Sequence, residues 1–180
     1  MVLNLKLVLI AAVSDLKGKR VIGSNGRIPW FSDDKVRKPD LERFKRLTLN
    51  KPIIMGRPTF ESLDYKPLPQ RTNIVVSGSS DMSEYQGAIQ AHNPDEALEI
   101  AAKFGETAYV IGGGRLYAQT ILSPYAVRLE ITEVTRKYDG DVHFPPIDWD
   151  VWQLQDEDRH EHYSFLTFGK RKLPLKKTFS

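Results

Sequence analysis

The feature that most constrains the fold is the junction at which Tyr109-Val110-Ile111 runs into three consecutive glycines and then into a segment that begins at Arg115. The first part is typical of a buried strand, and residues 115–121 are typical of a helix. Glycines at such a turn let backbone N–H groups approach a phosphate at the helix N-terminus, because no side chain holds the ligand away. The spacing is neither G-x-G-x-x-G nor a P-loop, so this motif alone fits a structural tight turn equally well.

Strand-like and helix-like segments alternate over most of the chain. Strands are expected at residues 5–13, 52–56, 73–77, 88–91, 109–111, 127–135, 151–158 and 162–169, and helices at 39–48, 57–63, 93–102 and 115–121. This alternation favours parallel connections, whereas no helix separates the last two strands. We therefore expect an α/β fold, with one domain at 1–171 and a basic tail at 172–180. Its sheet should have about eight strands, mostly parallel, with an antiparallel C-terminal edge hairpin and about four flanking helices.

Composition excludes several kinds of site. The chain has 180 residues, a net charge of +3 and no cysteine, which excludes disulfides, thiolate nucleophiles and zinc–thiolate centres. The four histidines lack metal-ligand spacing, no serine lies in a nucleophile elbow, and no basic run is interleaved with aromatics. We expect no metal and no nucleic-acid partner. The apolar run at 5–13 is too short to span a bilayer and contains Lys6, so we expect a cytoplasmic monomer that does not contact membranes.

Residues 39–48 are expected to form an amphipathic helix that opens at Pro39. Asp40 shares one face with Phe44 and other apolar residues, while Arg43 belongs to the charged face opposite. An acid that faces the interior needs either a partner or a chemical role. From this segment alone, the commoner interpretation is that Asp40 favours the positive end of the helix dipole.

Several polar side chains follow the C-terminal ends of predicted strands. They are Arg57, Thr59, Ser77 and Arg115. Each could be a surface charge or cap, but their shared position favours a phosphorylated cofactor. Arg71 follows a rigid Pro-Leu-Pro connector and could hold a carboxylate. The sequence offers neither a nucleophile nor a metal site. What it offers is one semi-buried acid, phosphate-binding turns and a closable loop at 14–32, and this combination fits proton-coupled hydride transfer with a bound cofactor.

Taken together, these motifs resemble the dihydrofolate reductase family over about residues 5–171. The matching motifs are Ile10-Ala11-Ala12, Val21-Ile22-Gly23, Ile28-Pro29-Trp30, Asp40 to Thr48, Pro52 to Arg57, Thr59 to Ser62, Pro67-Leu68-Pro69 with Arg71, Val110 to Gly114, Asp139-Gly140-Asp141 and Phe144-Pro145. The resemblance implies an NADPH-dependent oxidoreductase of one-carbon metabolism, an antifolate target that converts 7,8-dihydrofolate to 5,6,7,8-tetrahydrofolate. A pyrimidine reductase of riboflavin synthesis and a non-catalytic nucleotide-binding module are the alternatives; Arg71 and the helix at 39–48 favour folate.

On the substrate side, the resemblance implies that Asp40 pairs with the pterin and helps bring a proton to N5 through water. It places Thr132 in the same hydrogen-bond network, Trp30 beside an ordered water, and Arg71 on the α-carboxylate of the glutamate. The folate pocket is then expected to be lined by Ile10, Ala12, Leu41, Phe44, Leu63, Leu68 and Ile111.

On the cofactor side, the resemblance implies pyrophosphate contacts from Gly113, Gly114, Arg57 and Thr59. Arg57, Ser77 and Arg115 are candidates for the 2′-phosphate, which makes NADPH the expected cofactor. The other contacts are expected from Ala12, Ile22, Gly56, Ile111, Leu116 and Tyr117. The implied lid is the segment 22–30, with the Gly140-Asp141 loop as its brace.

The chain also departs from the family pattern. Residues 32–38 are extra material before Asp40, and they make Asp34 a second candidate for the acid. The helical register with Phe44 and Thr48 favours Asp40. Pro58 replaces a residue that could donate an N–H group, so one phosphate contact is expected to be missing.

Overall fold

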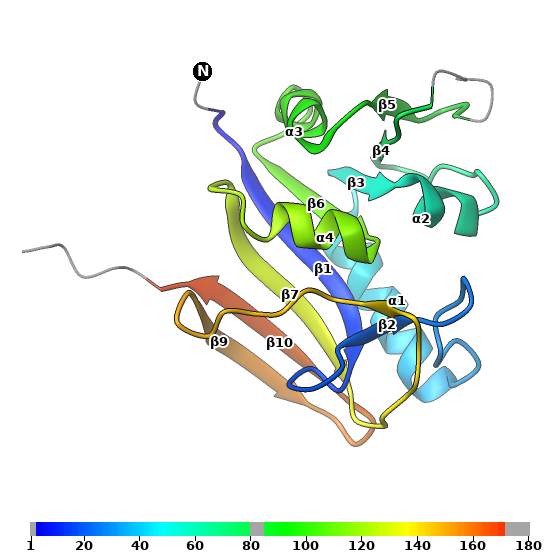
Figure 1. Cartoon of the computed structure of the whole chain (residues 1–180), viewed down its shortest axis with the longest axis vertical. Helices are drawn as coiled ribbons and strands as arrows, with labels where there is room; N and C mark the ends of the chain where they lie inside the picture. The colour runs from blue at the N-terminus through cyan, green and yellow to red at the C-terminus, as the bar shows by residue number, and fades with distance from the viewer. Residues whose placement is uncertain (1–2, 80–84, 172–180) are drawn as a thin grey trace, which may run out of the picture.

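The computed structural model describes residues 3–79 and 85–171, which form one mixed sheet with helices on both faces (Figure 1). Its strands are β1 (Lys6–Ser14), β2 (Val21–Gly23), β3 (Pro52–Gly56), β4 (Thr72–Val76), β5 (Ile89–Ala91), β6 (Thr107–Gly112), β7 (Ala126–Val134), β8 (Val142–His143), β9 (Trp152–Arg159) and β10 (Tyr163–Lys170). The main path runs β5-β4-β3-β6-β1-β7-β10-β9. The first six strands of this path are parallel, and β10 is antiparallel to both β7 and β9. The predicted α/β fold, with its antiparallel C-terminal hairpin, is confirmed.

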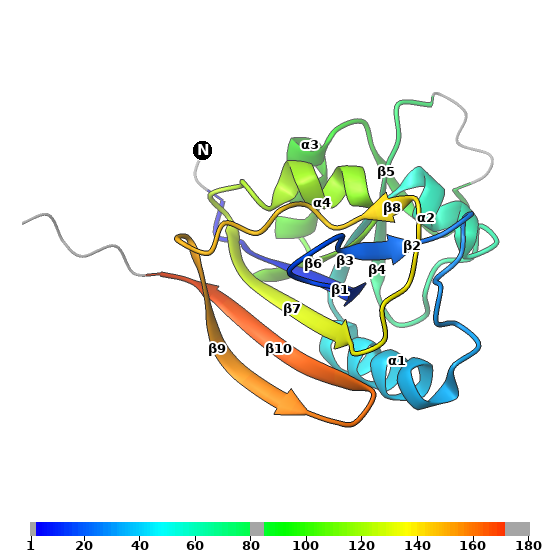
Figure 2. The same ribbon diagram turned by 60° about the horizontal axis from the view of Figure 1, so that its bottom comes forward.

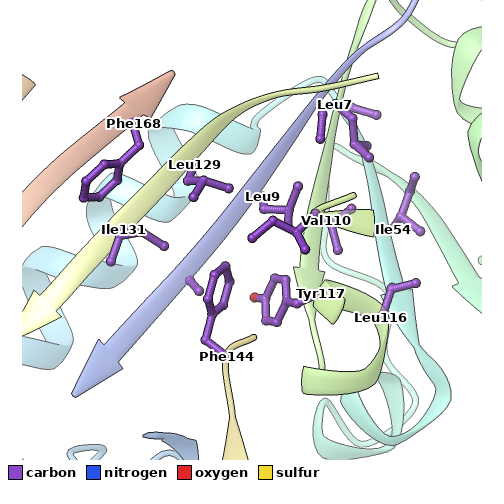
Figure 3. Close-up of a cluster of buried hydrophobic side chains, with 14 of the residues drawn as sticks. Leu7, Leu9, Ile54, Val110, Leu116, Tyr117, Leu129, Ile131, Phe144 and Phe168 are labelled. Atoms are coloured by element: carbon purple, nitrogen blue, oxygen red, sulfur yellow. The ribbon is translucent and has the colours of Figure 1, made fainter. Parts of the chain in front are cut away.

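The four helices are α1 (Asp34–Thr48), α2 (Arg57–Ser62), α3 (Pro94–Ala102) and α4 (Gly114–Thr120). Strand β1 shows why both faces of the sheet need cover, because its apolar side chains alternate between them. Leu7 and Leu9 pack with α3 and α4, whereas Val8 and Ile10 pack on the side of α1 and α2. Figure 3 shows the first of these cores, in which Tyr117 lies beside Phe144 with ring centroids 4.9 Å apart.

Helix α1 begins at Asp34, so the prediction that it opens at Pro39 was wrong. Asp33 caps the helix, because its carboxylate accepts from the Lys35 N–H at 3.1 Å. Val36 lies in the first turns and is only 1% exposed. The cap and this burial offset the backbone hydrogen bond that Pro39 cannot make inside the helix. The extra residues before Asp40 therefore lengthen α1 rather than the preceding loop.

The predicted loop at 14–32 contains a strand that sequence reasoning did not find. Strand β2 pairs antiparallel with β1 and, across a gap of more than 100 residues in the sequence, with β8 (Figure 2). Both strands are too short to show a periodicity. No helix within residues 3–79 and 85–171 is long and apolar enough to cross a membrane. The predicted tail at 172–180 lies outside the described residues, and the domain boundary stays a prediction.

Candidate active site

A cleft of about 1420 Å³ opens where β1 and β6 part. The two strands pair only as far as Leu9 and Val110, while β1 continues beside β7 to Ser14. Ile10 and Ile111, the next residues on each side, therefore face each other across an opening at the carboxyl ends of parallel strands. Ligands of open α/β sheets bind at such positions.

The structure brings most of the predicted site residues to this cleft. Its walls include Ile10, Ala12, Ile22, Trp30, Asp40, Leu41, Phe44, Gly56, Arg57, Thr59, Leu63, Leu68, Ser77, Ile111, Gly113, Gly114, Arg115, Leu116 and Tyr117. Thr132 and Arg71 are not part of the walls. Thr132 lies on β7 behind Asp40. It is 1% exposed, and its side chain forms a hydrogen bond with the Asp40 carboxyl group.

Arg71 lies beside the C-terminal end of α1, next to the cleft rather than in its wall. Its guanidinium donates to Thr48 Oγ1 at 2.8 Å and to the Pro69 carbonyl at 2.7 Å, and it lies 5.7 Å from the centre of the Phe44 ring. No carboxylate among the described residues pairs with it. The arginine is thus held in place by neutral groups and keeps its charge available.

Asp40 is half-buried in the cleft wall. Burial raises the pKa of its carboxyl group, while a hydrogen bond with the Thr132 side chain and the positive charge of Arg43 oppose this increase. Since α1 begins at Asp34, Asp40 is nearly two turns inside the helix, where the dipole effect has faded. The helix-end interpretation of Asp40 is therefore wrong.

Asp34 occupies the first turn instead. Its carboxylate is exposed to solvent and pairs with Arg37 and with Lys38 Nζ, the latter at 2.9 Å. These ion pairs lower the pKa of Asp34, the Lys38 bond contributing most. Asp34 is a helix-end charge outside the cleft wall, whereas Asp40 has the surroundings that tune a catalytic acid.

Two helix N-termini and a glycine turn form a second part of the cleft. Neither α2, capped by Gly56, nor α4, capped by Gly113, has a side-chain hydrogen bond at its N-terminus. A Cβ on Gly113 would have only Thr59 Oγ1 within 4 Å, at 3.4 Å, and the rest of its surroundings is open. Gly112 has φ +129°, a value that glycine adopts easily and other residues avoid. Backbone N–H groups at two adjacent helix starts fit the phosphates of a dinucleotide.

The polar residues predicted for the 2′-phosphate lie at the same end of the cleft. Arg57 Nε bonds Glu61 Oε1 at 2.6 Å, and Arg115 is exposed. Ser77 Oγ accepts from the Tyr85 hydroxyl at 2.8 Å. His92 also lines this end, and sequence reasoning missed it because a histidine before a helix cap carries no distinctive spacing.

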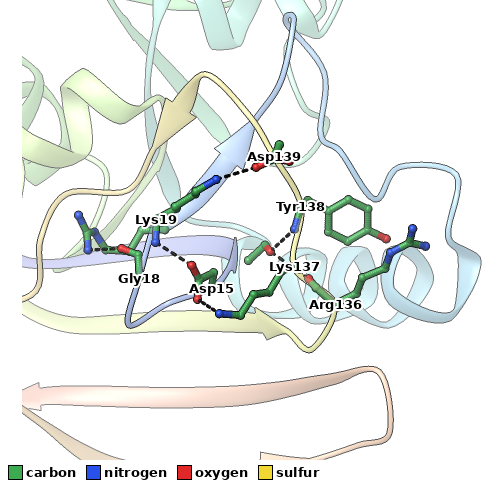
Figure 4. Close-up of polar contacts among 9 residues, drawn as sticks. Asp15, Gly18, Lys19, Arg136, Lys137, Tyr138 and Asp139 are labelled. Atoms are coloured by element: carbon green, nitrogen blue, oxygen red, sulfur yellow. Dashed lines mark hydrogen bonds and ion pairs between the residues drawn. The ribbon is translucent and has the colours of Figure 1, made fainter.

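The segment predicted to be a lid is tied to the Gly140-Asp141 loop. The Asp141 N–H donates to the Gly23 carbonyl at 3.1 Å, and its carboxylate accepts from the Asn25 N–H at 3.1 Å. Figure 4 shows the Lys19–Asp139 ion pair, 2.7 Å long, which joins the residues just before the lid to those just before Gly140. The brace predicted from the resemblance thus makes direct contacts; the motion of the lid stays a prediction.

Gly140→Ala should detach this brace, because the added Cβ would lie 2.2 Å from the Gly23 carbonyl oxygen. We expect the Asp141 and Asn25 amides to lose at least about tenfold in hydrogen-exchange protection, since local opening controls exchange in such segments. Exchange in the core of β1 should stay unchanged. Wild-type protection at both amides would contradict the assignment of this contact as the brace.

Sequence reasoning also missed a buried ion pair behind Asp40. Arg43, assigned to the charged face of the helix, is 7% exposed and contacts Glu130 of β7. The available signal was a single glutamate inside the apolar strand Leu129-Glu130-Ile131. A buried acid needs a partner, but the sequence does not say which cation supplies it.

Comparison with known proteins assigns the family. A family model described as Dihydrofolate reductase matches residues 6–170, which is nearly the whole described chain. The chain belongs to the dihydrofolate reductase family. Among its relatives, the dihydrofolate reductase of Bacillus subtilis is 38% identical over 91% of this chain and 95% of its own. That of Neisseria meningitidis is 41% identical over 83% of this chain and 85% of its own.

A solved structure supports the same conclusion. Dihydrofolate reductase from Enterococcus faecalis, complexed with NADP(H) and RAB-propyl, superposes with a TM-score of 0.79. It is 29% identical in sequence, and the match covers 93% of this chain and 97% of that one. The family assigned from motif order is therefore confirmed by both sequence and fold.

Proposed function

We propose that this chain reduces 7,8-dihydrofolate to 5,6,7,8-tetrahydrofolate with NADPH, in the cleft between β1 and β6, with Asp40 as the acid. One observation carries the proposal. Among the described residues that line the cleft, Asp40 is the only carboxylate, and it lies between an apolar wall and Thr132. A single desolvated acid opposite a phosphate-binding turn fits protonation coupled to hydride transfer.

The chain's own residues fit NADPH. The uncapped starts of α2 and α4 offer backbone N–H groups to the pyrophosphate. Arg57, Ser77, Arg115 and His92 also line the cleft. They can bind an additional phosphate, which supports NADPH rather than NADH as the cofactor. When bound, NADPH supplies the hydride. Ala12, Ile22 and Ile111 give the reacting ring an apolar surface that limits access of water.

Asp40 binds and orients the pterin in this proposal. In its ionised form the carboxylate accepts hydrogen bonds from the amino group and ring N–H. In its protonated form, which burial maintains to higher pH than in an exposed aspartate, it supplies the proton that reaches N5 through water. Thr132 holds the carboxyl group from behind. Trp30, which is 2% exposed and lies 5.6 Å from Tyr138 between ring centroids, forms the wall where a water can be held.

The remaining substrate contacts divide into apolar and charged groups. Leu41, Phe44, Leu63 and Leu68 line one wall of the cleft and suit the flat aromatic part of the folate. Arg71, held by neutral partners beside Phe44, suits the α-carboxylate of the glutamate.

The test is the decrease in absorbance at 340 nm when the purified chain is mixed with NADPH and dihydrofolate. We expect rapid oxidation of NADPH with dihydrofolate and little with the pyrimidine substrate of riboflavin synthesis. The same assay with NADH should give a higher KM for the cofactor. No oxidation with dihydrofolate, or a preference for the pyrimidine, would contradict the proposal.

The raised pKa of Asp40 also predicts how stability depends on pH. The folded state holds this proton more tightly than the unfolded state does, so the contribution to stability is full below the unfolded pKa, about 3.9, and is lost as pH rises through the folded pKa. Without ligands, Asp40→Asn should therefore be more stable than wild type at pH 7, and the difference should shrink towards pH 4. Urea unfolding across this range measures it, and a less stable variant at pH 7 would contradict the sign.

The cytoplasm is the compartment we propose. The apolar N-terminal run forms the central strand β1, with β6 and β7 on either side, so its composition is explained by the core. Cell fractionation followed by the 340 nm assay measures where the activity lies. Secretion of the enzyme in active form would contradict a cytoplasmic location.

A further inference from the structure

The Arg43–Glu130 ion pair lies one helical turn beyond Asp40. Arg43 Nη2 is 2.5 Å from Glu130 Oε2, and the two side chains are 7% and 6% exposed. Arg43 follows Asp40 by three residues on α1, and Glu130 precedes Thr132 by two on β7, so each pair keeps to one face of its element. Asp40–Thr132 and Arg43–Glu130 are therefore two successive contacts between the same helix and the same strand.

The ion pair is built into the sheet rather than placed by chance. Thr167 is the residue of β10 that pairs with Glu130, and its hydroxyl donates to Glu130 Oε2 at 2.8 Å. The guanidinium carbon of Arg43 lies 4.8 Å from the centre of the Phe165 ring. Buried ion pairs are often no more stabilising than apolar side chains of the same size, so stability alone is a weak reason for this one.

Other charged and titratable groups also face this region from the surrounding elements. Arg128 Nη1 lies 3.7 Å from Glu130 Oε1 on β7, and Arg46 lies one turn further along α1. The pKa of Tyr109 on β6 is raised by burial and by the negative charge of Glu130, while Arg128 and Arg43 oppose this increase. From α4, the Tyr117 hydroxyl donates to the Ile10 carbonyl at 2.6 Å, and its pKa is raised by burial and by Asp40. Among these groups, Arg43 is the cation that acts directly on Asp40.

We propose that Arg43 and Glu130 are positioning residues that set the pH range over which Asp40 works; this rests on the proposed function. The positive charge of Arg43 favours the carboxylate form of Asp40, and Glu130 fixes the guanidinium and partly offsets its charge. Neither residue lines the cleft, so both act through Asp40 and not on the substrate.

The proposal predicts opposite effects from the two halves of the pair. Arg43→Met removes the cation, so Asp40 should keep its proton to higher pH, and the pH at which the single-turnover rate falls to half should rise by about half a unit. Glu130→Gln leaves the cation without its partner, so the same midpoint should fall by about half a unit. Stopped-flow oxidation of NADPH from pH 5 to 9 measures both.

Three variants control for structural damage. Arg43→Lys keeps the charge and should restore the wild-type midpoint within about 0.2 units, even if it lowers stability. Arg46→Met removes an exposed arginine from the next turn of the same helix, and its midpoint should stay within about 0.2 units of wild type. Arg43→Met/Glu130→Gln removes both charges, so its midpoint should lie between those of the single variants.

A readout without turnover separates this inference from the proposed function. The carboxyl resonance of Asp40, followed by carbon-13 NMR in the ligand-free chain, should titrate at higher pH in Arg43→Met and at lower pH in Glu130→Gln. If wild type fails to reduce dihydrofolate but these shifts occur, the proposed function is wrong and the coupling holds. If both variants shift the titration in the same direction, or neither shifts it, the pair is only structural and the inference is overturned.

Discussion

Asp40→Asn is expected to lower the rate of dihydrofolate reduction at pH 7 by at least about a hundredfold, the lower end of what a positioned proton donor contributes. The amide has nearly the size of the carboxyl group but cannot carry the proton. Asp40 is not among the expected cofactor contacts, so the cleft should still bind NADPH normally. The measurement is the single-turnover rate of NADPH oxidation, beside a fluorescence titration that gives the cofactor Kd.

The matched control is Asp34→Asn. Asp34 pairs with Arg37 and Lys38 at the exposed start of α1, and surface ion pairs of this kind contribute little. Its turnover should therefore stay within about twofold of wild type. Full activity in Asp40→Asn together with a large loss in Asp34→Asn would move the acid to Asp34 and overturn the site.

The pH profile of Asp40→Asn tests the chemistry further. Dihydrofolate can arrive already protonated in acid, so the variant should recover part of its rate as pH falls from 7 to 5. Wild type should change less over this range, because burial keeps the proton on Asp40 to higher pH than in an exposed aspartate. A variant whose rate changed with pH in parallel with wild type would indicate a role in binding only.

Gly113→Ala is expected to weaken NADPH binding by at least about tenfold, or 1.4 kcal/mol, with little effect on folding. The new Cβ meets only Thr59 Oγ1, at 3.4 Å, so the ligand-free fold has room for it. The open space around it lies in the cleft, where the methyl group would hold a phosphate away from the backbone N–H groups. Fluorescence titration gives the Kd, and urea unfolding gives the stability.

Gly105→Ala is the matched glycine control. Its Cβ would also make only ordinary contacts, 3.6 Å from Pro52 Cδ at the nearest, and Gly105 lies outside the cleft wall. The cofactor Kd should stay within about twofold of wild type, as expected for a site with no contact to the ligand. If Gly113→Ala bound NADPH like Gly105→Ala, the turn at 112–114 would be structural rather than a phosphate site.

Local patterns were enough to predict the sheet and the position of the cleft. Apolar runs of strand length, such as Pro52–Gly56, matched their strands, and Asn93 caps α3 through the Glu96 N–H at 2.9 Å as its sequence implies. Glycines and polar residues after several strands pointed to one edge, because parallel strands bring their carboxyl ends together. These inferences needed only neighbouring residues.

What failed depends on contacts between distant residues. The start of α1 was misplaced because the burial of Val36 against Trp30 and Val134 outweighs the break expected at Pro39. Arg43 was assigned to solvent because its partner Glu130 lies 87 residues away. Strand β2 needs β8, which lies still further away in the sequence, since Val21 pairs with His143. A helical or strand period in one segment carries no information about such partners.

The most direct test of the account is the titration of the Asp40 carboxyl group in ligand-free wild type, followed by carbon-13 NMR and assigned by its loss in Asp40→Asn. We predict a midpoint clearly above about 3.9, the value for an unstructured peptide, because desolvation in the cleft outweighs the Thr132 hydrogen bond and the charge of Arg43. A midpoint at or below that value would contradict it, since Asp40 would then be an ordinary ionised carboxylate with no proton to supply near neutral pH.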